Sequence, residues 1–145
     1  MSLFDISITV PAGTYVLGDP CYNIYGSDSN GIDRWDGWLE RVGIGDIMAA
    51  EVPGSDHVVV AFSTSHGDGC WVLRESGVKT QLKIAADAGM IGLIPVAYIQ
   101  EQGQVISGLD QNIVQVVHFN RTTRCHIKKD GTLVFGRFSI QTDGV

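Results

Sequence analysis

Apolar and polar residues alternate along several short segments of this chain, a pattern typical of strands that bury one face. Residues 4–10, FDISITV, place four apolar residues on one side and three polar residues on the other. Residues 14–18, TYVLG, resume an extended segment after a turn at PAG. Residues 57–65 and 70–76, HVVVAFSTS and CWVLRES, are rich in β-branched and aromatic side chains, and the HGDG between them predicts a hairpin.

The second half of the chain continues this pattern. Residues 111–120, QNIVQVVHFN, and residues 123–129, TRCHIKK, predict another pair of strands. The clearest hairpin signal is RCHIKK-DG-TLVFGRFSI, two strands around Asp130 and Gly131, which suit the positive φ angles of a type I′ turn.

Helical signals are confined to one segment, GIDRWDGWLERVG. We expect Asp33 to cap a helix that ends at Gly43. Its apolar face consists of Trp35, Trp38, Leu39 and Val42. Gly37 weakens this prediction. The chain is therefore expected to be mainly β, or β-rich α+β, as a sandwich or partly closed barrel of short antiparallel strands with one short helix.

Length and composition indicate a single domain spanning residues 1–145. An apolar content of 44% and a charged content of 18% are typical of soluble globular proteins. No apolar run is long enough for a transmembrane helix, and the first ten residues carry no sign of a signal peptide. Three widely spaced cysteines do not form a disulfide framework, so a reducing cytoplasm is the expected location.

The formal net charge of −6 argues against nonspecific nucleic-acid binding. The charge is uneven, because residues 118–137 hold one acidic residue, Asp130, and five basic residues. The basic residues are Arg121, Arg124, Lys128, Lys129 and Arg137. They form either a solvated strand face or a patch that holds a small anion or an acidic partner surface.

Three motifs place an aspartate within two residues of a glycine: LGDPCY at 17–22, HGDGCW at 66–71 and ADAGMIGLIP at 86–95. Gly89 and Gly92 in the last motif indicate close backbone approach or a bulge. One interpretation is that Asp19, Asp68 and Asp87 accept backbone hydrogen bonds within turns. The other is that the three carboxylates converge as a metal or acid–base cluster, although their spacing matches no known metal motif.

Two other arrangements would give these motifs a chemical role. His66, Asp68 and Cys70 alternate, so with Cys21 or His57 they could form a zinc site, although the intervening glycines favour a turn. Cys21 could act as a nucleophile with His66 or His126 as base, or serve as a small buried apolar residue.

Aromatic residues concentrate in the first half of the chain, where they either fill the core or line a cleft. Tyr22, Trp35 or Trp71 could stack on a planar ligand such as a nucleobase, with Arg121, Arg124 or Lys128 binding its phosphate. No phosphate-binding loop is present. The candidate ligand-binding residues are Asp19, Tyr22, His66, Asp68, Trp71, Asp87, Arg121 and Arg124.

In its three motifs the chain resembles a family of small, uncharacterised proteins encoded largely by bacteriophages. The shared elements stand here as GDPCY at 18–22, STSHGDGCW at 63–71 and DAGMIGLIP at 87–95. The pair Cys70-Trp71 departs from the family, in which a tyrosine more often follows the glycine. The resemblance covers roughly residues 13–97 and leaves the basic C-terminal hairpin unmatched. It implies a phage accessory protein in the infected cell, and motif turns that form one shared feature.

Three functions are compatible with these features. The first is a non-enzymatic phage protein that binds a small anionic, nucleotide-like ligand or a host protein, with a role against host defence. The second is a small metal-assisted hydrolase that uses Asp19, Asp68 and Asp87 with His66. The third is a virion or assembly component. We favour the first function, which requires no cofactor, metal or membrane. Exposed strand edges could also pair between two copies of the chain, which would form a homodimer.

Overall fold

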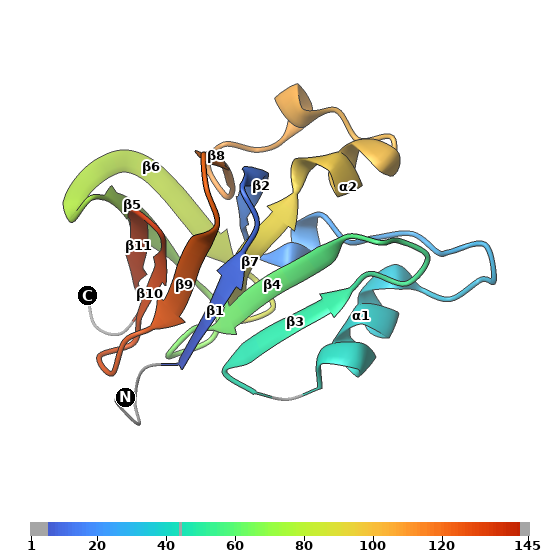
Figure 1. The fold of residues 1–145 in the computed structure, drawn as a ribbon, viewed down its shortest axis with the longest axis horizontal. Helices are drawn as coiled ribbons and strands as arrows, with labels where there is room; N and C mark the ends of the chain where they lie inside the picture. The colour runs from blue at the N-terminus through green and yellow to red at the C-terminus, as the bar shows by residue number, and fades with distance from the viewer. Residues whose placement is uncertain (1–5, 44, 143–145) are drawn as a thin grey trace.

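The computed structural model describes residues 6–43 and 45–142, and it is a sandwich of two antiparallel β-sheets, as predicted (Figure 1). Sheet A has the order β1 (Ile6–Val10), β9 (Thr123–Ile127), β10 (Thr132–Phe135), β11 (Phe138–Gln141), β5 (Gly69–Glu75) and β6 (Val78–Ala86). Sheet B has the order β3 (Ile47–Glu51), β4 (Val58–Ser63), β7 (Met90–Pro95), β2 (Gly13–Gly18) and β8 (Gln115–Phe119). The helical segments are η1 (Pro20–Tyr22), α1 (Arg34–Val42), α2 (Val96–Glu101) and η2 (Ile106–Gly108).

The central strands of sheet B, including β4, are buried on both faces, which explains the apolar run from Val59 to Phe62. On β4, Val60 and Phe62 belong to the core between the two sheets, whereas Val59 and Ala61 belong to a second core under the helices. Successive strand residues point to opposite faces, so both faces must be apolar here. Figure 1 shows α1 and α2 beside sheet B, away from sheet A. No helix in the described ranges is long and apolar enough to cross a membrane.

The predicted helix is confirmed with both of its ends. The Asp33 carboxylate accepts a hydrogen bond from the backbone N–H of Asp36, and Gly43 follows the last turn with φ of 68°. Gly37 has a packing role, since a Cβ there would lie 2.6 Å from Cγ of Pro53. The residue that weakened the prediction therefore allows the helix to pack closely.

The prediction of a hairpin at HGDG, residues 66–69, is wrong. The strands on either side of it, β4 and β5, lie in different sheets: β4 pairs with β3 and β7, and β5 pairs with β6 and β11. The connection therefore carries the chain from sheet B to sheet A. The same correction applies to residues 111–120 and 123–129, because β8 pairs with β2 and β9 pairs with β1 and β10.

The hairpin around Asp130 and Gly131 is confirmed, but its turn differs from the predicted type. Gly131 has φ of 86°, whereas Asp130 is not among the described residues with positive φ. Gly131 donates to the carbonyl of Lys128, and Lys128 donates to the carbonyl of Thr132, so three residues form the loop instead of two. The sequence TLVFGRFSI also makes two strands, β10 and β11, around a tight turn that begins at Gly136.

Candidate functional site

The LGDPCY and ADAGMIGLIP motifs meet at the buried carboxylate of Asp19, which is 0% exposed. Its Oδ1 accepts a hydrogen bond from the N–H of Cys21 at 2.9 Å. Its Oδ2 accepts from the N–H groups of Asp87 and Ala88 at 2.9 and 2.7 Å. Asp19 therefore joins η1 to the β6–β7 turn, which is the turn-forming role considered for it in the sequence.

The HGDGCW motif joins the same end of the sandwich through Gly89. The N–H of Thr64 donates to the carbonyl of Gly89 at 3.0 Å, and the Thr64 hydroxyl contacts the carbonyls of Gly67 and Gly89. A Cβ at Gly89 would lie 3.3 Å from Cα of Gly67, so the two turns are in close contact. The three motifs thus form one structural feature, here called the motif end.

The carboxylates of the motif end do not form a metal cluster. Asp19 is buried, whereas Asp68, Asp87 and His66 are exposed. Within residues 6–43 and 45–142, no group of three or more His, Cys, Asp or Glu side chains is arranged to hold a metal ion. A metal-assisted hydrolase would need a set of metal-binding side chains, and these described residues do not form one.

The electrostatics of the motif end favour neutral thiol and phenol groups. Burial, together with the negative charge of the adjacent Asp19 carboxylate, raises the pKa of the Cys21 thiol to about 12. Burial also raises the pKa of Tyr22, with contributions from Cys21, Asp87, Asp19 and Asp68. At neutral pH Cys21 is a protonated thiol, so it lacks the thiolate that a nucleophilic cysteine needs.

We expect Cys21 to resist alkylation by iodoacetamide at neutral pH in the native protein. A rise from the ordinary value of 9.0 to about 12 lowers the thiolate fraction about a thousandfold. Peptide mapping by mass spectrometry should find Cys70, which is exposed, modified first. In urea all three cysteines should react. Native Cys21 reacting as fast as Cys70 would contradict this electrostatic description.

The remaining predicted ligand residues are not brought together with Tyr22. Trp71 is half-buried against the core between the sheets, and its ring covers Gly69. Arg121 follows Phe119, which pairs with the Gly13 end of β2, far along that strand from Asp19. Arg124 lies on the outer face of sheet A. The structure therefore does not place an aromatic residue of the motif end beside the two arginines.

The outer face of sheet A carries a cationic surface instead. One row of residues crosses all six strands in register and points away from the core: Ser7, His126, Val134, Ser139, Arg74 and Lys79. Arg124 and Lys128 share this side of β9 with His126, and Lys83 pairs with Val72 on β5. Arg74, Lys79, Lys83, Arg124 and Lys128 make up five of the ten lysines and arginines.

Few acidic side chains neutralise the positive charge of this surface, which is here called the cationic face. The six strands of sheet A contain one carboxylate, Glu75. Glu75 accepts a hydrogen bond from Nε of Arg137 at 3.0 Å. The cationic face is therefore a region of positive potential on a protein whose net charge is −6.

A depression of about 390 Å³ lies within the cationic face. Its lining residues are Ser76, Gly77, His126, Lys128, Val134, Gly136, Arg137, Phe138 and Ser139. The guanidinium of Arg137 lies over the Phe138 ring, 4.4 Å from its centroid. A smaller depression of about 210 Å³ involves Arg74 and Lys79. The larger one combines cations, hydroxyls and apolar surface in one place.

The basic C-terminal segment was predictable from the sequence, but the residues that complete the cationic face were not. Arg124 and Lys128 were recognised, whereas Arg74, Lys79 and Lys83 were missed. Alternation along the strands offered a signal, since Arg124, His126 and Lys128 are two residues apart and must share a side. The link to β5 and β6 depended on strand pairing, which the sequence does not specify.

No family model matches this chain, and comparisons with curated proteins and with solved structures find no significant match.

Proposed function

We propose that this protein is a non-enzymatic binding protein that holds a small anionic, nucleotide-like ligand against the cationic face. The observation that carries the proposal is the depression of about 390 Å³ lined by Lys128, His126 and Arg137. The cationic side chains attract a phosphate group and orient it through hydrogen bonds. The hydroxyls of Ser76 and Ser139 can donate further hydrogen bonds to it.

The apolar part of the depression suits the other half of such a ligand. Val134 and Phe138 contribute apolar surface beside the charged groups. A planar base can pack against such surface while its phosphate lies near Lys128. The depression therefore offers complementary surfaces to both parts of a nucleotide.

This proposal moves the ligand away from the motif end. Asp68 and Asp87 are exposed there, and the Asp19 carboxylate is buried at the same end. These carboxylates repel an anion, whereas the cationic face attracts one. The resemblance to phage proteins supports a setting in an infected cell, where removal of an anionic signal would counteract host defence.

The proposal is tested by titrating isotope-labelled protein with adenosine diphosphate at low salt and recording amide NMR spectra. We expect saturating shifts at Ser76, Gly77, Val134 and Ser139, and weaker binding as salt is raised, because ions screen exposed charges. Adenosine, which lacks the phosphates, should bind more weakly.

Charge-removing variants locate the site. Lys128→Gln and Arg74→Gln should each weaken binding about threefold to fivefold, the size of one exposed ion pair. Arg41→Gln removes the same charge on α1, which covers the opposite side of sheet B, and should leave the affinity unchanged. The proposal is overturned if millimolar nucleotide causes no shifts, or if the shifts centre on Tyr22.

A further inference from the structure

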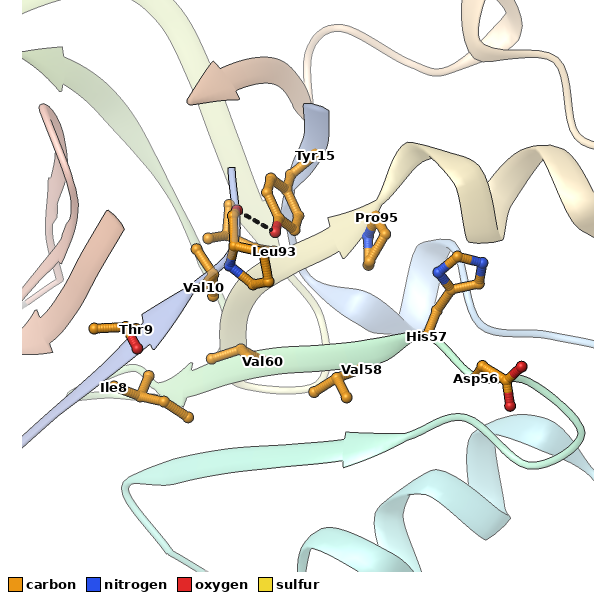
Figure 2. A pocket seen from close by; sticks show the side chains of 11 residues that line it. Ile8, Thr9, Val10, Tyr15, Asp56, His57, Val58, Val60, Leu93 and Pro95 are labelled. Atoms are coloured by element: carbon orange, nitrogen blue, oxygen red, sulfur yellow. Dashed lines mark hydrogen bonds between the residues drawn. The ribbon is translucent and has the colours of Figure 1, made fainter. Parts of the chain in front are cut away.

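A separate cavity of about 420 Å³ lies at the edge of the sandwich where β1 faces β4 (Figure 2). It is lined by Ile8, Thr9, Val10, Pro11, Tyr15, Asp56, His57, Val58, Val60, Leu93 and Pro95. The Tyr15 hydroxyl donates to the carbonyl of Pro11 at 2.7 Å, which fixes the crossing from β1 to β2 above the cavity. None of the lining residues belongs to the motif end, and only Thr9, which pairs with Arg124, borders the cationic face.

The cavity exists because sheet B extends past the edge of sheet A. Val58 and Val60 point from β4 toward the same side, the side of the core between the sheets. Val60 is 4% exposed, but Val58 is 46% exposed. β1 is the last strand of sheet A at this edge, so no further strand covers Val58. An inward-facing valine is thus left uncovered beside a space of ligand size.

The two ends of the cavity differ in chemistry. Figure 2 shows Ile8 and Thr9 at one end and His57 and Asp56 at the other. Asp56 lines the second end with an exposed carboxylate, and Nε2 of His57, which also lines it, lies 3.0 Å from Oε1 of Glu101 outside the lining. The surface between the ends is apolar and includes the buried side chains of Val10, Val60 and Leu93.

We infer that this cavity binds a small amphiphile with an apolar chain and a cationic head. The chain lies along the apolar lining, where each buried CH₂ group contributes about 0.8 kcal/mol. The head lies near Asp56, whose negative charge attracts a cation and repels an anion. The net charge of −6 adds to this preference. The site does not depend on the cationic face, so each can be tested without the other.

Octylammonium, octanol and octanoate test this inference, because they share one chain length and differ in the charge of the head. We expect isothermal titration calorimetry to rank their affinities in that order. Val58→Trp should fill the open side of the cavity and weaken all three. Val116→Trp is the matched control: Val116 is 49% exposed, also on a strand, and outside the cavity.

A second pair of variants tests the cationic head. Asp56→Asn should weaken octylammonium about threefold to fivefold and leave octanol unchanged, because it removes one exposed charge from the cavity end. Asp68→Asn removes an exposed aspartate elsewhere and should change neither affinity. The inference is overturned if no probe binds, if octanoate binds as tightly as octylammonium, or if Val116→Trp weakens binding as much as Val58→Trp.

Discussion

Replacing Gly92 with alanine is expected to reduce the free energy of unfolding by about 3–5 kcal/mol, a large part of the 5–15 kcal/mol typical of a domain. Gly92 lies in β7, at the centre of sheet B, opposite Ala61 of β4 and Gly18 of β2. A Cβ at this position would overlap the carbonyl oxygen of Val60 and lie 2.7 Å from Cα of Ala61. Both obstacles include backbone, which cannot move without disturbing the strand pairing.

Urea denaturation of the purified variants measures this effect. Gly108→Ala is the matched control, because a Cβ at Gly108 meets nothing within 4 Å and its φ is not in the positive range. The control should differ from the wild type by no more than about 0.5 kcal/mol. A Gly92→Ala protein as stable as Gly108→Ala would contradict the close contact between β7 and β4.

Asp19→Asn is expected to cost about 2–3 kcal/mol of stability, because buried hydrogen bonds to a charged group are strong. The carboxylate has three backbone donors distributed over both oxygens. An asparagine presents an NH₂ group in place of one oxygen, so at least one backbone N–H faces another donor. The connection between η1 and the β6–β7 turn should loosen first.

The controls for this prediction come from the other two motifs. Asp68→Asn and Asp87→Asn make the same chemical change on exposed side chains and should alter stability by about 0.5 kcal/mol or less. Thermal and urea unfolding of the three variants would separate them. Equal losses in all three would mean that the aspartates contribute alike, against the structural role assigned here to Asp19 alone.

Local features of the fold were predictable because they depend on neighbouring residues. The alternation that ends at Val10 and the capping by Asp33 require only the pattern and one hydrogen bond. Strand partners were not predictable, because β-branched runs specify an extended segment without specifying its sheet. HGDG therefore indicated a turn correctly, while its crossing from sheet B to sheet A depends on pairing with distant strands.

The candidate site likewise has one part that was predictable from the sequence and another that was not. The turn interpretation of Asp19 was available from its Asp-Pro sequence and is confirmed by the three backbone donors. The cationic face was not available, because it joins Arg74 to His126 through two intervening strands. The cavity beside Val58 was also missed, since a valine in an apolar strand gives no indication that its neighbouring sheet ends early.

The position of β1 has a consequence during protein synthesis. β1 ends at Val10, and the strand it pairs with, β9, begins at Thr123, which is 113 residues later (123 − 10). At ribosomal rates of about 5–20 residues per second, the first strand waits roughly 6–23 s before its partner emerges. During that time its backbone groups and apolar side chains have no native sheet to join. Chaperone binding to the nascent N-terminal segment would protect the chain at this stage.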